Sequence, residues 1–119
     1  MILLVDDSRA QHALQEKILT THGIPAAQIR KASHGEEALN CMRTDCPRLM
    51  VLDWNMPGMT GLEIVRKVRE ENKEIAIVMV TSESDQQRFI EALEAGANGY
   101  ITKPITSNSL WEAVQPYLT

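Results

Sequence analysis

Apolar and β-branched residues gather in five short runs, and segments with helical periodicity lie between and after these runs. The runs are ILLVD at 2–6, QIRKA at 28–32, RLMVLD at 48–53, EIAIVMV at 74–80 and GYIT at 99–102. In the other segments, apolar residues three or four positions apart mark one face of a helix. These faces are Ala10/Leu14/Ile18, Ala38/Leu39/Met42, Ile64/Val65/Val68, Phe89/Ala92/Leu93 and Leu110/Val114/Tyr117. The pattern therefore predicts five strands that alternate with five helices.

The residues that border the helical segments are typical of helix ends. Three tetrapeptides have the form of a capping box, in which a hydroxyl accepts an amide hydrogen and an acid or amide three residues later reaches back: SHGE at Ser33, TGLE at Thr60 and SDQQ at Ser84. Gly23 and Gly96 stand where a left-handed helix exit is expected. Pro116 removes a backbone hydrogen bond, so the last helix should end or kink near Gln115.

Strict alternation of strand and helix predicts an α/β fold with parallel strands and right-handed crossovers. The continuous apolar runs ILLV and IAIVMV favour a sheet that is covered on both faces. Five such units most often form a doubly wound, flavodoxin-like sheet in the order 2-1-3-4-5. We therefore predict one domain over residues 1–119, with helices on both faces of a five-stranded parallel sheet.

Composition narrows the possible functions. A chain of 119 residues, 44% hydrophobic and 24% charged, suits one globular domain. The net charge of −4, with no basic run longer than Arg30-Lys31, argues against binding to a nucleic-acid backbone. The N-terminal segment MILLVDDS is apolar for only a few residues before two acids, which is too short for the apolar core of a secretory signal. No apolar stretch approaches the ~20 residues that span a membrane. We expect a cytoplasmic protein without membrane insertion.

The predicted topology brings acidic residues together. In the order 2-1-3-4-5, ligands bind at the carboxyl ends of the first and third strands, where the winding reverses. The first strand ends in Asp6-Asp7 and the third in Asp53. The neighbouring fourth and fifth strands end near Thr81 and Lys103. Three carboxylates, a hydroxyl and an ammonium group should therefore meet at one edge of the sheet.

Such a cluster predicts a metal site. A lone aspartate at a strand end is more often a turn residue, but carboxylates a few Å apart repel by about 4 kcal/mol per pair at an effective dielectric near 20. A hard divalent cation removes this repulsion, and Mg²⁺ suits oxygen ligands of this kind. We therefore expect Mg²⁺ to bind at this edge.

The same residues suit phosphoryl transfer. A carboxylate can attack phosphorus and form an aspartyl phosphate, provided that a metal, a cation and a hydroxyl hold the phosphoryl oxygens. The sequence has no GxxxxGK[ST] motif and no evident Ser-His-Asp or Cys-His arrangement. We interpret His12, His22 and His34, which fall within or beside helices, as solvated surface groups.

Four motifs carry a family resemblance that covers essentially the whole chain. LLVDDS, VLDWNMPGMTG, VMVTSES and GYITKP resemble, in order and spacing, the motifs of response-regulator receiver domains of two-component signalling. DWNMPGMTG and GYITKP are similar to single-domain, chemotaxis-type receivers in particular.

The resemblance implies a phosphoacceptor and a set of metal ligands. Asp53 would be the phosphoacceptor. Asp7 would bind Mg²⁺ directly and Asp6 mainly through water. The backbone carbonyl of Asn55 would add a further ligand, which leaves its side chain free to shape the entrance to the site.

The resemblance also implies a switch. Thr81 would bind a phosphoryl oxygen and move on activation, and Lys103 would pair with the phosphoryl group, with a cis peptide bond before Pro104. Tyr100 matches the family's aromatic switch position, although periodicity alone favours a plain strand aromatic. Asn55, Ser82 and Glu83 would flank the entrance. Ser82 departs from the small alanine or glycine that is commoner there.

The leading hypothesis is a phosphorylation switch and not a dedicated turnover enzyme. A histidine kinase would donate the phosphoryl group, and the face formed by the last two helices and the fifth strand would change its partner preference. The output would be another protein or a separate output domain. A metal-dependent phosphatase or a flavin-binding module on the same sheet is the alternative, since fold alone excludes neither. Trp54 should sense the metal, and Trp111 should lie partly exposed on the output face or seal the rim of the core.

Overall fold

The alternation predicted from the sequence is the architecture of the chain. The computed structural model describes residues 1–82 and 86–118. Within those residues, five parallel strands form one sheet in the order β2-β1-β3-β4-β5. The strands are β1 Ile2–Val5, β2 Ile29–Ala32, β3 Leu49–Asp53, β4 Ala76–Thr81 and β5 Gly99–Thr102. The predicted order is confirmed, and the predicted strand limits differ from these by at most two residues.

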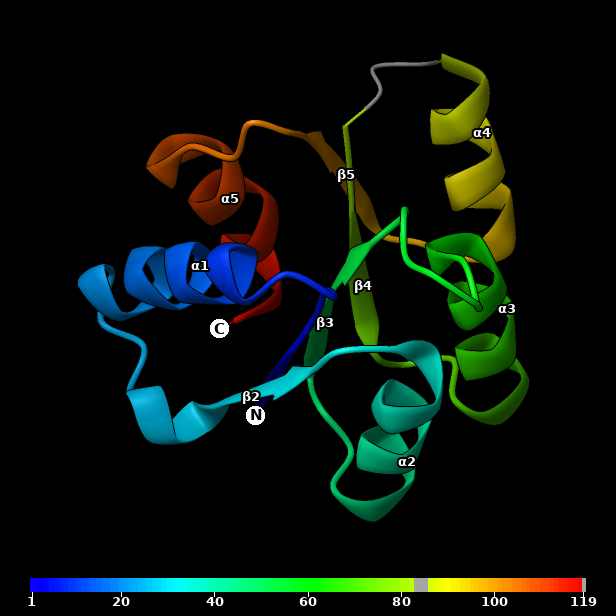
Figure 1. The fold of residues 1–119 in the computed structure, drawn as a ribbon, viewed down its shortest axis with the longest axis horizontal. Coiled ribbons are helices and arrows are strands. Elements are labelled where there is room, and N and C mark those ends of the chain that lie inside the picture. Colours follow the sequence, from blue (N-terminus) through cyan, green and yellow to red (C-terminus); the bar gives the residue numbers. More distant parts are fainter. Residues whose placement is uncertain (83–85, 119) are drawn as a thin grey trace.

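The helices cover the sheet in two layers (Figure 1). One face carries α1, Arg9–Thr21, and α5, Ser107–Val114. The other face carries α2, Gly35–Thr44, α3, Gly61–Glu71, and α4, Gln86–Ala95. Two short 3-10 helices, η1 Ala26–Gln28 and η2 Gln115–Tyr117, complete the described elements. All of the described helices are too short or too polar to traverse a lipid bilayer.

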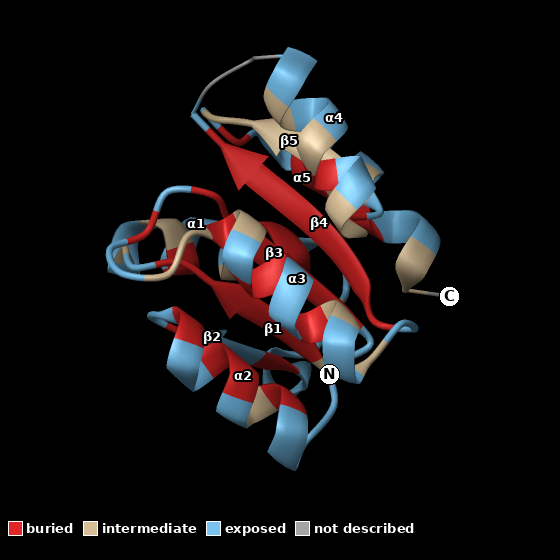
Figure 2. Cartoon of the chain, turned by 90° about the vertical axis from the view of Figure 1, so that its right-hand side faces the viewer, coloured by how far each residue is buried: buried red, intermediate tan, exposed pale blue. Residues whose placement is uncertain are grey.

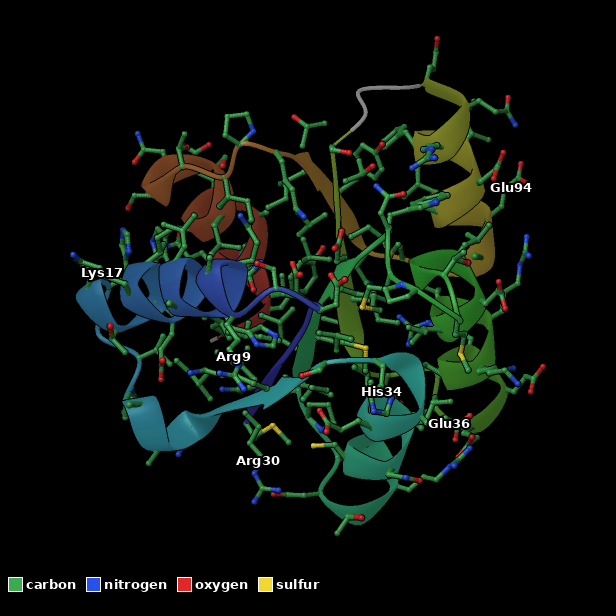
Figure 3. The ribbon with its side chains drawn as sticks, viewed as in Figure 1. Arg9, Lys17, Arg30, His34, Glu36 and Glu94 are labelled. Carbon is green, nitrogen blue, oxygen red and sulfur yellow. The ribbon has the colours of Figure 1, made fainter. Side chains whose placement is uncertain are left out.

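The sheet divides the core into two apolar layers. Along β1, Leu3 and Val5 point into the layer under α2, α3 and α4, whereas Ile2 and Leu4 point into the layer under α1 and α5. This is the two-residue period of a strand that is buried on both faces. Figure 2 shows the buried strands β1, β3 and β4, with the partly exposed β5 at one edge, between helices whose outer faces are exposed. Charged side chains such as Lys17 and Glu94 project from those outer faces (Figure 3).

The helix ends test the predicted caps. Thr60 caps α3, because its side-chain oxygen accepts a hydrogen bond from the amide of Glu63, at 3.3 Å. The predicted cap at Ser33 is wrong: α2 is capped by His34, whose Nδ1 accepts from the amide of Glu37 at 3.3 Å. An imidazole nitrogen can accept this bond as a hydroxyl can, which shifts the start of the helix by one residue. Ser84 lies outside the described residues.

The buried face of α1 differs from the prediction. The buried residues are His12, Gln15, Ile18 and Leu19, whereas Leu14 is 38% exposed and Ala10 is exposed. His12 is 6% exposed, so its interpretation as a surface group is wrong. The apolar residues of α1 are compatible with burial of either of two helix faces. The face that is buried is the one that carries both Ile18 and Leu19, and His12 and Gln15 lie on that same face.

The other predicted helix faces have mixed outcomes. The apolar faces predicted for α2 and α3 are buried as expected. On α4 only Ala92 is buried, and Phe89 and Leu93 are 41% and 44% exposed. Gly23 and Gly96 adopt positive φ, as predicted for helix exits. The final helix ends at Val114, directly before the 3-10 turn that contains Pro116.

The start of α3 lies against the end of β3, and only glycine fits there. A Cβ atom on Gly61 would lie 2.5 Å from the carbonyl oxygen of Asp53 and 2.8 Å from the Cα of Trp54. The amide of Gly61 donates to the carbonyl of Trp54 at 2.9 Å. This close backbone approach holds the end of β3 in place.

We expect Gly61→Ala to lower the free energy of unfolding by roughly 1–3 kcal/mol, because backbone atoms must move to admit the methyl group. Chemical denaturation checks this. Gly35→Ala is the matched control, since Gly35 also begins a helix but its Cβ would meet side-chain atoms and not backbone, namely Sδ and Cβ of Met59 at 2.9 and 3.1 Å and Cδ1 of Ile64 at 3.3 Å. The control should lose less than about 1 kcal/mol. Equal losses in the two variants would contradict a special role for the contact at Gly61.

Candidate functional site

Three carboxylates meet at the carboxyl ends of β1 and β3. Asp6, Asp7 and Asp53 each offer an oxygen, and these three oxygens lie within 4.8 Å of one another. Asp53 is the last residue of β3, and its backbone pairs with Val80 of β4. Asp6 follows β1, and its amide donates to the carbonyl of Ala32 at 3.1 Å. The sheet register itself therefore creates the cluster that the sequence predicted.

The loop after β1 fixes the orientation of Asp6. Its Oδ1 accepts a hydrogen bond from the amide of Ser8 at 2.9 Å, and the hydroxyl of Ser8 caps α1 by accepting from Gln11. Asp6 is 1% exposed, whereas Asp7 is exposed. One carboxylate is thus held inside the sheet edge, and its neighbour faces solvent.

Lys103 brings a positive charge to the cluster. Its Nζ lies 3.4 Å from Oδ2 of Asp53 and 3.8 Å from Oδ2 of Asp6. Its backbone amide donates to the carbonyl of Thr81 at 2.7 Å, which anchors the end of β5 to the end of β4. The peptide bond between Lys103 and Pro104 is cis.

One ammonium group does not compensate for the buried carboxylates. Burial raises the pKa of Asp53, the charge of Asp6 raises it further, and Lys103 lowers it only in part. Burial likewise raises the pKa of Asp6, against the lowering effects of the Ser8 amide and Lys103. The ionised forms of both groups are therefore disfavoured at this edge of the sheet.

The cluster fits a hard divalent cation. Oδ2 of Asp6 is buried and has no hydrogen-bond partner. A carboxylate oxygen in that position needs a cation to offset its desolvation. The atoms of this cluster that could bind a metal are all carboxylate oxygens, which Mg²⁺ prefers over nitrogen or sulfur ligands.

Polar residues from two other segments line the edge beside Asp53. Thr81, at the end of β4, is fully buried. The amide of Asn55 donates to Oδ1 of Asp53 at 3.3 Å, and its side-chain nitrogen donates to the hydroxyl of Ser82 at 3.3 Å. The structure thus brings together Asp53, Asn55 and Ser82, whereas Glu83 lies outside the described residues.

Arg88 belongs to this edge and was missed by the sequence analysis. It lies in the first turn of α4, and its Nη1 donates to Oγ1 of Thr81 at 3.3 Å and to Oδ1 of Asn55 at 3.4 Å. Its guanidinium carbon lies 5.0 Å from the centroid of the Trp54 ring. A basic residue in the first turn of a helix opposes the helix dipole. In the sequence, this unfavourable position in the helix was the one indication that other contacts hold Arg88 in place.

The aromatic residues lie in different parts of the fold. Trp54 is 7% exposed beneath Arg88. Tyr100 is half-buried on β5 and meets Phe89 of α4 edge-to-face, with ring centroids 5.5 Å apart. Trp111 is half-buried and stacks on His22, the residue directly after α1, with centroids 4.4 Å apart. Trp111 is thus partly exposed, as predicted, and it packs against the core layer under α1 and α5, which fits the alternative that it seals the rim of the core.

Because the pKa of Asp53 is raised, the stability of the Mg²⁺-free protein should depend on the ionisation of this carboxylate. An ionised Asp53 destabilises the fold, and this penalty builds up as pH rises from the ordinary value of 3.8 through the raised pKa. Asp53→Asn should therefore raise the free energy of unfolding at pH 7 by roughly 1–3 kcal/mol. The gain should shrink as pH falls through the raised pKa toward 3.8.

Urea denaturation over a pH series, with a chelator present, measures this difference. Glu94→Gln removes an exposed carboxylate of α4 and serves as the control, with an expected change of less than about 0.5 kcal/mol. A gain that stays constant from pH 7 to pH 4, or a loss of stability at pH 7, would contradict the electrostatic origin of the effect.

Comparison with known proteins places this geometry in a family. Residues 2–115 match the response regulator receiver domain. A chemotaxis protein CheY homolog of Campylobacter jejuni is 39% identical over 120 residues, which cover 98% of this chain and 91% of that protein. The chemotaxis protein CheY of Pseudomonas aeruginosa is 37% identical and covers 96% of this chain and 92% of its own length.

Solved structures agree with the sequence matches. Chemotaxis protein CheY4 of Vibrio cholerae superposes with a TM-score of 0.89 at 31% identity, covering 98% of this chain and 97% of its own. The receiver domain of NtrX from Brucella abortus gives a TM-score of 0.90 at 27% identity, covering 99% of this chain and 98% of its own. The chain therefore belongs to the receiver domains of response regulators, the phosphorylation-dependent switches of two-component signalling.

Proposed function

We propose that Asp53 accepts a phosphoryl group from a histidine kinase in the presence of Mg²⁺, and that the whole chain acts as one receiver domain in the cytoplasm. The observation that carries the proposal is the position of the Asp53 carboxylate. It ends β3, lies with Asp6 and Asp7 within 4.8 Å, and has the Lys103 ammonium group 3.4 Å away. Membership of the receiver family supports the same role.

The metal ligands in this proposal are the three carboxylates and the backbone carbonyl of Asn55. Asp7 is exposed and can turn an oxygen directly to the ion. Asp6 is buried with Oδ1 bound to the Ser8 amide, and in this proposal it would act on the ion mainly through water. Bound Mg²⁺ would neutralise the carboxylates and polarise the phosphoryl oxygens.

An oxygen of Asp53 attacks phosphorus, and the bond between phosphorus and the donor atom breaks with its electrons leaving on the donor. Lys103 lies beside the nucleophile and stabilises negative charge on the phosphoryl oxygens. The hydroxyl of Thr81 then donates to one of these oxygens. The movement of Thr81 is the event that the rest of the domain senses.

The output surface in this proposal is formed by α4, β5 and α5. Phe89, Ile90 and Leu93 of α4 are 41%, 40% and 44% exposed, an apolar surface that suits a protein partner. Tyr100 contacts Phe89 edge-to-face and can change its packing when Thr81 moves. The partner is a protein target or a separate output domain, and direct nucleic-acid binding forms no part of the proposal.

Acetyl phosphate tests the phosphoacceptor. With Mg²⁺, the wild-type protein should take up one phosphoryl group per chain, detected as a mass increase and lost slowly by hydrolysis. Asp53→Asn should remain unlabelled under the same conditions, because an amide is not a nucleophile. A stably labelled Asp53→Asn protein would place the acceptor elsewhere.

The same preparation separates a switch from a dedicated phosphatase. A phosphoesterified dye offered in large excess should be turned over at no more than the rate at which the labelled protein loses its phosphoryl group. Many turnovers per minute that depend on Asp53 would favour the enzyme. Tight binding of a flavin in the dark, without any labelling, would favour the flavin module.

Mg²⁺ titration tests the metal site through tryptophan fluorescence. Trp54 follows Asp53 directly, whereas Trp111 stacks on His22 in another layer. We expect Trp111→Phe to keep the Mg²⁺ response and Trp54→Phe to lose most of it. Asp7→Ala should weaken the affinity by about tenfold or more, because it removes a direct ligand from a site with few.

Glu36→Gln, on the exposed side of α2, is the control for a general charge effect on Mg²⁺ binding and should titrate as wild type does. If Trp54→Phe keeps the full response, or Asp7→Ala binds as tightly as wild type, the ion does not bind between Asp7 and Asp53.

A further inference from the structure

Arg88 joins the first turn of α4 to the edge that carries Asp53. Among residues 1–82 and 86–118, its guanidinium group contacts the side chains of Thr81 at the end of β4, Asn55 in the loop after β3, and Trp54 directly after β3. No motif of the receiver resemblance includes this residue. Its contacts nevertheless include Thr81, the residue whose movement the proposed function requires.

The contact with Thr81 is geometrically specific. The Thr81 side chain is fully buried, so its hydroxyl has few possible orientations, and Oγ1 accepts from Nη1 of Arg88 at 3.3 Å. The same nitrogen donates to Oδ1 of Asn55 at 3.4 Å, while the guanidinium carbon lies over the Trp54 ring, 5.0 Å from its centroid. A planar group with several contacts is held more firmly than a lysine ammonium would be. The Arg88 head group is therefore a fixed partner for Thr81.

We propose that Arg88 is a positioning residue that holds Thr81 in the unphosphorylated arrangement and couples its release to α4. This inference rests on the proposed function, in which Thr81 moves toward a phosphoryl oxygen. When Thr81 moves, its hydrogen bond to an Arg88 anchored by Trp54 and Asn55 must lengthen or break. The contact therefore favours the resting state, and its loss frees the first turn of α4 to shift.

The geometry favours this role over direct binding of the phosphoryl group. Among the described residues, the cation within ion-pair distance of the Asp53 carboxylate is Lys103, at 3.4 Å. The Nη1 atom of Arg88 is directed to Thr81 and Asn55, which lie on the side of the edge next to α4. In this proposal Lys103 therefore stabilises the charge at Asp53, and Arg88 positions Thr81.

A double-mutant cycle with beryllofluoride tests the inference. Beryllofluoride adds to an aspartate carboxylate in place of a phosphoryl group, and fluorine NMR reports its binding independently of tryptophan. Its apparent affinity with saturating Mg²⁺ is measured for the wild type, Arg88→Ala, Thr81→Val and the double variant. Valine keeps the shape of the buried threonine and removes its hydroxyl.

Arg88→Ala should bind beryllofluoride about three- to tenfold more tightly than wild type, because the resting state loses a charge-assisted hydrogen bond. In the Thr81→Val background the same substitution should change the affinity by less than about twofold. Amide exchange at residues 90–92, whose amides can bond to carbonyls of the first turn of α4, gives a second readout: in wild type it should rise when beryllofluoride binds, and in Arg88→Ala it should be fast throughout.

Controls separate the inference from the function on which it rests. Arg66→Ala removes an exposed arginine of the neighbouring α3 and should leave the affinity unchanged. If the wild type fails to bind beryllofluoride, or Asp53→Asn binds it, the proposed function itself fails. Weaker binding by Arg88→Ala would make Arg88 a phosphoryl-binding cation, and an equal effect in both backgrounds would mean that it does not act through Thr81. Either result overturns the inference.

Discussion

The crowding of three carboxylates at one edge of a parallel sheet is the constraint on which the rest of this structure depends. Parallel strands end on the same side, so the order β2-β1-β3-β4-β5 places Asp6 and Asp53 at the ends of neighbouring strands. Burial raises the pKa of both groups, the charge of Asp6 raises that of Asp53 further, and the charge of Asp7 raises that of Asp6. The fold holds this unfavourable arrangement because the strands that carry it are fully buried and anchor it on two apolar layers. Stability from the core thus maintains a site that is itself destabilising.

Much of the fold and the carboxylate cluster could be predicted because they depend on short-range patterns. Apolar runs define the strands, and a run that ends in Asp6 or Asp53 places its carboxylate at the sheet edge once the topology is known. The motifs around Asp53, Thr81 and Lys103 then named the family before any geometry was considered. The direct contact of Lys103 with Asp53 follows from the adjacent order of β3, β4 and β5.

Other features could not be predicted because they depend on which elements face one another. The buried face of α1 carries His12 and Gln15, whose polarity hides it from a search for apolar periodicity. Trp111 stacks on His22, a contact between the last helix and the residue directly after α1 that no local pattern encodes. Arg88 was overlooked for a similar reason, since its contacts depend on how α4 packs against the ends of β3 and β4: Asn55 lies 33 positions before it and Thr81 lies 7 positions before it.

The contact between Gly61 and the end of β3 makes the two sides of the site differ in rigidity. On the side of α3, the backbone of Asp53 and Trp54 abuts the helix with no free space, so this side acts as a rigid wall. On the side of α4, the contacts are made by the side chains of Arg88 and Thr81, which can exchange partners without moving a strand. In the proposed switch, a displacement at Asp53 would therefore be transmitted toward α4 and not toward α3. In such a domain, the contact that deforms least determines the direction in which a movement is transmitted.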